Sequence, residues 1–178
     1  MKEIDVPRDE LFITTKVLSN VKDPEQALKN SLQKIGVEYV DLYLIHAPFD
    51  VEIEKAWKSL EGLKDQGTLF CQQKLTTGLA KNIGVSNFRI KDIERILKIA
   101  KHKPVVNQIE FHPYLQQNNL RKFHAENDIL TEAYSPLCPL TTKKDGPLTA
   151  VVERIAKEQG KTPAQVSRLR HVAYSRSC

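Results

Sequence analysis

The sequence predicts an α/β protein whose strands lie parallel in one sheet, and three observations lead to this prediction. Five short apolar runs alternate with segments of helical spacing, and parallel neighbours need such helical crossovers. A polar or titratable residue stands near the carboxyl end of each run. No Gly-x-Gly-x-x-Gly follows the first run, which disfavours the dinucleotide-binding doubly wound fold. An open doubly wound sheet and a (β/α)₈ barrel both fit the alternation, although a complete barrel takes about 250 residues and this chain has 178.

The first β/α unit has the clearest boundaries. Residues 11–15 are apolar and β-branched, as expected of a short strand. Asp23 and Pro24 then supply an N-cap and a proline at the first helical position, and apolar residues recur at helical spacing as far as Gly36. Since glycine is typical of the position after a helix, we predict that the helix ends there.

The rest of the chain repeats this pattern of an apolar run followed by a helical segment. We therefore predict a single domain over residues 1–178. Periodicity places the further strands at 40–45, 82–85, 105–109 and 129–134, and the further helices at 54–64, 90–101, 118–126 and 147–159.

Polar side chains gather at the carboxyl ends of the predicted strands. These ends share one rim in a parallel α/β fold, and catalytic groups collect there. Each residue alone has an ordinary explanation: a solvated lysine, a loop histidine, a helix cap, a buried amide or a core tyrosine. Because the placement recurs on five strands, we expect the side chains to converge. The residues are Lys16, His46, Ser86, Asn87, Gln108, Tyr134 and Ser135.

Composition excludes several classes of protein. The net charge is +5, but four basic residues and no acidic one lie from Lys161 onward, so the remainder is near neutral and a solvated surface is favoured over nucleic-acid binding. No apolar run reaches the roughly 18 residues of a membrane span. The cysteines Cys71, Cys138 and Cys178 are widely spaced and form no metal or redox pattern. We therefore expect no metal site and a cytoplasmic protein with free thiols.

Five segments, in order along the chain, resemble the motifs of aldo-keto reductases. They are residues 12–16 (FITTK), 40–48 (VDLYLIHAP), 83–88 (IGVSNF), 106–113 (VNQIEFHP) and 133–137 (AYSPL). The resemblance extends over about residues 7–166. It implies an α/β fold of the parallel (β/α)₈ TIM-barrel type that is incomplete here, with about five β/α units resembling strands three to seven.

The resemblance also implies an activity and a set of site residues. Reductases of this family reduce aldehydes or ketones to alcohols with NADPH, using an Asp, a Tyr, a Lys and a His. A carbonyl that accepts hydride develops oxyanion charge, which needs a proton donor and positive charge nearby. By position, Lys16 and His46 match the catalytic lysine and histidine. The residues that match cofactor contacts are Ser86, Asn87 and Gln108 at the nicotinamide carboxamide, Tyr134 stacked on the ring, and Ser135 and Leu137 at the diphosphate.

The chain departs from the family pattern where the catalytic Tyr and Asp are expected. These belong to a segment before the lysine strand, and the fifteen residues that precede Lys16 contain no tyrosine and no matching aspartate motif. Strand alternation turns Tyr43 away from the face that carries His46. We therefore expect this chain to be impaired as a reductase.

Two other segments also depart from the family. Residues 68–78 (TLFCQQKLTTG) interrupt a junction where helix and strand usually join directly, and residues 167–178 form a divergent basic tail. The insertion is explained either by an ordinary surface loop or, as we favour, by an aberrant transcript, which sequencing of the transcript would decide.

Two other classes of function stay open at this stage. One is a non-catalytic relative that binds a protein partner, like the potassium-channel β subunits that share this fold. The other is a flavodoxin-like nucleotide binder, which the missing glycine-rich loop disfavours.

Overall fold

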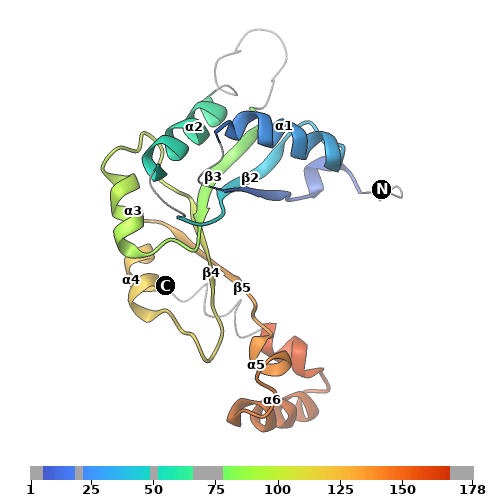
Figure 1. The fold of residues 1–178 in the computed structure, drawn as a ribbon. Coiled ribbons are helices and arrows are strands. Elements are labelled where there is room, and N and C mark those ends of the chain that lie inside the picture. The colour runs from blue at the N-terminus through green and yellow to red at the C-terminus, as the bar shows by residue number, and fades with distance from the viewer. Residues whose placement is uncertain (1–5, 19–21, 49–51, 66–77, 169–178) are drawn as a thin grey trace. The chain divides into compact units, whose positions relative to one another are not determined.

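The computed structural model describes residues 6–18, 22–48, 52–65 and 78–168 (Figure 1). The chain divides into two compact units, residues 1–105 and 106–178. No helix in the described ranges is long and apolar enough to cross a membrane. Most of the predicted insertion at 68–78 and of the predicted tail at 167–178 lies outside these ranges.

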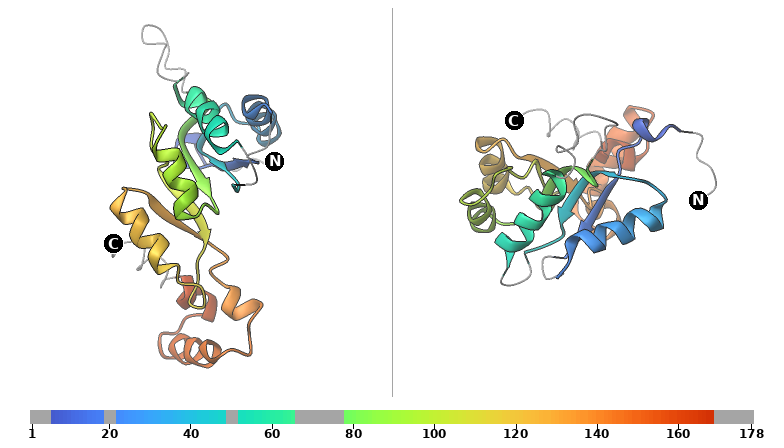
Figure 2. Two further views of the ribbon diagram at one scale, coloured as in Figure 1. Left: turned by 60° about the vertical axis from the view of Figure 1, so that its left-hand side comes forward. Right: turned by 90° about the horizontal axis from the view of Figure 1, so that it is seen from above.

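In its described residues, the first unit contains three parallel strands, each followed by a helix. Strand pairing places Lys16 beside Leu44 and Ile45 beside Val85, so the carboxyl ends of the three strands are aligned. Figures 1 and 2 show the three α-helices in one layer against these strands, and α2 packs between the other two. The elements are η1 (Arg8–Glu10), β1 (Thr14–Val17), α1 (Pro24–Ile35), β2 (Val40–Ile45), α2 (Ile53–Asp65), β3 (Ala80–Ser86) and α3 (Ile90–Leu97).

The described part of the second unit contains two parallel strands and three named helices. Pairing of its strands places Gln108 beside Glu132 and Glu110 beside Tyr134. Residues 163–168 are also helical. The elements are β4 (Val106–Glu110), α4 (Asn118–Glu126), β5 (Leu130–Tyr134), α5 (Cys138–Thr141) and α6 (Pro147–Glu158).

Helix α1 forms as its sequence predicts. The Asp23 carboxylate accepts a hydrogen bond of 2.9 Å from the amide of Gln26, and Pro24 occupies the first helical position. The helix ends at Gly36, whose φ of 80° is the left-handed conformation that glycine adopts without a steric penalty. Leu28 and Leu32 are buried on the inner face of the helix.

Strand β1 begins and ends later than the sequence predicts. The prediction was 11–15, whereas the strand covers Thr14–Val17. Side chains bind the earlier residues: Arg8 Nη1 donates to the Leu11 carbonyl, and the Ile13 amide donates to Asp41 Oδ2 at 2.9 Å. Among residues 11–13, only the Ile13 carbonyl bonds to the backbone of β2, accepting from the amides of Asp41 and Leu42. Lys16 is therefore the penultimate residue of β1, near the carboxyl end of the strand.

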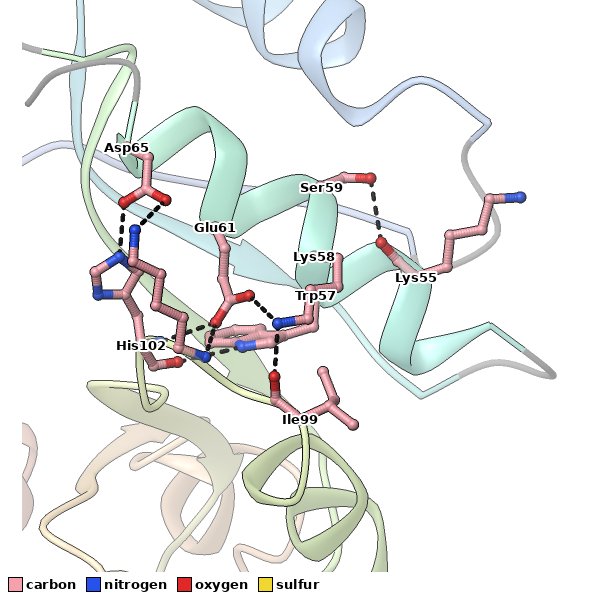
Figure 3. Close-up of polar contacts among 9 residues, drawn as sticks. Lys55, Trp57, Lys58, Ser59, Glu61, Asp65, Ile99 and His102 are labelled. Atoms are coloured by element: carbon pink, nitrogen blue, oxygen red, sulfur yellow. Dashed lines mark hydrogen bonds and ion pairs between the residues drawn. The ribbon is translucent and has the colours of Figure 1, made fainter. Parts of the chain in front are cut away.

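A polar network at the end of α2 explains why α3 stops at Leu97 and not near residue 101. Figure 3 shows the Glu61 carboxylate facing the chain that follows α3. Its Oε1 accepts the amide hydrogens of Lys101 at 2.6 Å and His102 at 2.8 Å, and its Oε2 accepts from Lys58 at 2.8 Å. Because the Lys101 and His102 amides donate to Glu61, they are not available to continue the helix.

The same network binds the connection between α3 and β4 to α2 at two further points (Figure 3). The buried Trp57 indole donates to the His102 carbonyl at 3.2 Å. Asp65 accepts from Lys101 Nζ and lies 2.8 Å from His102 Nε2. In parallel β/α folds, connections at the amino ends of the strands contribute to stability, whereas catalytic groups collect at the carboxyl ends.

Candidate functional site

The carboxyl ends of β1, β2 and β3 bring four predicted site residues onto one rim. The amide of His46 donates to the Val17 carbonyl at 2.7 Å, one residue after Lys16. Asn87 Nδ2 donates to the His46 carbonyl at 3.0 Å and lies 3.1 Å from Ser86 Oγ. The strand ends that carry Lys16, His46, Ser86 and Asn87 therefore lie side by side, and the role of each side chain stays a prediction.

The four residues differ in their access to solvent. The His46 side chain is exposed and that of Lys16 is half-buried, so both can reach a molecule at the rim. Ser86 is fully buried and Asn87 half-buried. A buried hydroxyl beside an amide provides a rigid hydrogen-bonding pair, because packing fixes the rotamers.

Asn87 has a φ of 61°, in the left-handed region that few residues other than glycine enter. Asparagine tolerates this region better than most residues, but the conformation still costs on the order of 1 kcal/mol. Ser135, which directly follows β5 in the second unit, has a φ of 54°. Strained residues thus follow a strand in both units, at two positions that the family resemblance predicts to contact the cofactor.

The second unit holds the other predicted cofactor residues. Gln108 is buried within β4, two residues before the strand ends at Glu110. Tyr134 is the last residue of β5, and its pKa is raised by burial and by the nearby carboxylate of Glu110. Ser135 is exposed, and Leu137 is half-buried directly before α5.

Tyr43 points away from the rim, as strand alternation predicts. Its side chain is 1% exposed, and its hydroxyl donates to the Pro24 carbonyl of α1 at 3.0 Å. Burial raises its pKa. Tyr39 precedes β2 at its opposite end, and the cations of Arg8 and Lys81 lie 3.8 Å and 4.1 Å from its ring centroid. Among the described residues of the first unit, no tyrosine hydroxyl lies on the rim of Lys16 and His46.

Sequence reasoning missed a second group of polar residues, Glu110, His112 and Cys138. One ligand atom from each lies within 4.8 Å of the others. Glu110 and His112 are two apart at the end of a strand, a spacing that places both side chains on one face. That spacing was a usable signal, whereas Cys138 is too distant in sequence for any pattern to connect it with them.

Comparisons with known proteins agree with this architecture. The model of the aldo/keto reductase family matches residues 1–174. An NADPH-dependent alpha-keto amide reductase of Saccharomyces cerevisiae is 42% identical over 175 residues, which cover 90% of this chain and 53% of that protein. A methylglyoxal reductase, DkgA, of Yersinia pestis is 41% identical over 169 residues, which cover 93% of this chain and 56% of that protein.

A solved structure gives the same result. The crystal structure of an aldo/keto reductase from Brucella melitensis superposes with a TM-score of 0.78 at 37% identity, covering 96% of this chain and 62% of the other. The fold is therefore that of a (β/α)₈-barrel reductase, in part. The chain belongs to the aldo/keto reductase family. It spans between 53% and 62% of the length of these three relatives.

Proposed function

We propose that this chain carries part of an NADPH-dependent reductase site that converts aldehydes or ketones to alcohols. The observation that carries the proposal is the shared rim of Lys16, His46, Ser86 and Asn87 in a chain of this family. One relative is named as NADPH-dependent, and the relatives named above reduce a keto amide and methylglyoxal.

The residues present fit a nicotinamide cofactor. Ser86 and Gln108 are polar groups buried at or near strand ends, and hydroxyl and amide groups match the donor and acceptor atoms of a carboxamide. In the first unit, Ser86 and Asn87 would contact that carboxamide, and in the second unit Gln108 offers groups of the same kind. Tyr134 offers an aromatic face for stacking. Ser135 and Leu137 would contact the diphosphate. When bound, the cofactor supplies the hydride.

Two residues of the rim would act on the carbonyl group. The exposed imidazole of His46 can donate a hydrogen bond to the carbonyl oxygen and fix its orientation. The ammonium of Lys16 can stabilise the negative charge that develops on that oxygen, because opposite charge nearby favours the ionised form.

We also propose that these 178 residues alone turn over slowly. The reduced carbonyl oxygen must receive a proton, and general-acid catalysis by a positioned group typically contributes a factor of about 10² to 10⁴. Tyr43, whose hydroxyl is bound to α1, does not reach the rim. The matching Tyr and Asp of the family motif do not occur among the residues before Lys16.

Cofactor binding and turnover test this proposal separately. NADPH binding, followed by the fluorescence of its reduced nicotinamide, is expected to weaken about tenfold in Ser86→Ala, the loss of one buried hydrogen bond. Ser59→Ala is the matched control, because that hydroxyl bonds within α2 to the Lys55 carbonyl. Absence of NADPH binding, or an equal loss in the control, would overturn the assignment.

Turnover is measured by oxidation of NADPH with methylglyoxal and a keto amide. The residual rate is expected to fall further in Lys16→Met and to stay unchanged in Lys91→Met, an exposed lysine of α3. Turnover in the ordinary enzyme range of about 1 to 10³ s⁻¹ would contradict the proposed impairment. A loss of the residual turnover in Tyr43→Phe would also contradict the proposal, because Tyr43 would then take part in the reaction.

A further inference from the structure

The second unit contains a cavity of about 610 Å³ with three potential metal ligands in its wall. Glu110 is the last residue of β4, His112 follows two residues later, and Cys138 opens α5. Strand pairing sets Glu110 beside Tyr134, four residues before Cys138, which explains how the three meet. Their ligand atoms all lie within 4.8 Å of one another.

The imidazole of His112 is held rigidly and is incompletely bonded. Its residue is 6% exposed, and its amide and carbonyl both bond to Leu115. Nε2 lies 3.1 Å from Glu110 Oε1, whereas Nδ1 is one of two buried side-chain atoms with no partner in the part of the chain that the structure describes. Such an unmet buried group costs about 1–3 kcal/mol, a cost that a ligand can remove.

The chemistry of the three groups selects a particular kind of ion. A thiolate, an imidazole and a carboxylate are the ligands of zinc, whereas magnesium and calcium prefer oxygen alone. Cys138 is a free, half-buried thiol, so its sulfur is available. Two other charges line the cavity: Lys143, which opposes a cation, and Asp145, which offsets it.

We propose that Glu110, His112 and Cys138 bind a zinc ion, with the fourth coordination position open to the cavity. Tetrahedral coordination brings ligand atoms to about 3.5 Å from one another. A separation of at most 4.8 Å therefore requires only side-chain rotation. Binding displaces the thiol proton and requires a neutral imidazole. This site goes beyond the reductase proposal and does not depend on it.

The test uses zinc itself with the whole chain. In competition with a chromophoric chelator, one zinc ion per chain is expected to bind, and Cys138→Ser and His112→Gln should each weaken its affinity at least about tenfold. The matched controls are Cys71→Ser, Cys178→Ser and His102→Gln, which should leave the affinity unchanged. Cobalt in place of zinc should give a sulfur-to-metal absorption band that disappears in Cys138→Ser.

A second measurement uses the unaltered chain, so its result does not depend on whether a variant folds. Zinc should protect Cys138 from alkylation, while the alkylation rates of Cys71 and Cys178 stay the same, as followed by peptide mass spectrometry. The proposal is overturned if zinc leaves the alkylation of Cys138 unchanged. It is equally overturned if folded Cys138→Ser, checked by circular dichroism, binds zinc as the unaltered chain does.

Discussion

His124 is a fully buried histidine of α4 whose two ring nitrogens are both engaged. Nε2 lies 3.0 Å from the Asn107 amide nitrogen, and Nδ1 lies 2.8 Å from Thr131 Oγ1. With the Asn107 nitrogen as donor, Nε2 is the acceptor and Nδ1 carries the hydrogen. Burial, with a smaller contribution from the Arg121 charge, lowers the pKa of His124 from 6.5 to about 4.

This lowered pKa predicts a loss of stability in mild acid. The unfolded chain takes up the proton more readily than the folded one, so the contribution is complete above pH 6.5 and decreases as the pH falls to about 4. The slope is at most about 1.4 kcal/mol per pH unit. Urea unfolding across this window should show the slope in the unaltered chain and in His46→Gln, but not in His124→Gln. A flat profile in the unaltered chain would refute the interpretation.

The start of α6 depends on a glycine for reasons of space. A Cβ at Gly146 would collide with the Tyr114 hydroxyl and would lie 3.0 Å from its ring carbon Cζ and 3.1 Å from the Lys143 carbonyl. The same hydroxyl accepts the Leu148 amide hydrogen at 3.1 Å, so displacing Tyr114 also removes a bond to the first turn of α6.

Gly146→Ala is therefore expected to lower the free energy of unfolding by about 1–3 kcal/mol. Gly62→Ala is the matched control, because Gly62 lies in α2 with no atom near its missing Cβ. That change should stabilise the chain by about 0.5–1 kcal/mol, since alanine favours a helix. Urea unfolding of both variants measures the difference. If the two variants changed the free energy of unfolding equally, the Tyr114 side chain would move aside without a loss of stability.

Local sequence patterns predicted the boundaries of those helices and strands whose ends are set by neighbouring residues. Strand β2 and helix α4 begin and end where apolar periodicity placed them, at 40–45 and 118–126. Strand β1 and helix α3 differ because Asp41 and Glu61, distant in sequence, accept backbone hydrogens at their ends. No local pattern contains such bonds.

The sequence likewise predicted the part of the site that depends on strand alternation and missed the part that depends on contacts between distant residues. Alternation and the alignment of parallel strand ends placed His46 and Ser86 on one rim and turned Tyr43 away from it, and the first unit confirms all three. The partnership of Cys138 with His112 was missed because residues that far apart meet only through the pairing of β4 with β5. Roles in catalysis stay predictions, since geometry locates groups without measuring chemistry.

Acid should destabilise the first unit through two largely buried carboxylates. Asp41 accepts from Arg8, Lys81 and the Ile13 amide, and Glu61 from Lys58 and two amides. Burial acts to raise the pKa of both, but the hydrogen bonds and cations outweigh it, so both pKa values are lowered from 3.8 and 4.5. The stability that they contribute is present above those values and decreases as the pH falls through the folded-state pKa.

The two acid effects can be separated, because they occur in different pH windows and arise from different units. His124 acts between pH 6.5 and about 4, whereas the carboxylates act below 4.5. Asp41→Asn should lower stability at neutral pH and flatten only the lower part of the profile, while His124→Gln should flatten only the upper part. Urea midpoints from neutral pH to about pH 3 measure both. If Asn at position 41 left the lower part as steep as before, the buried ion pairs would not be the cause of acid unfolding.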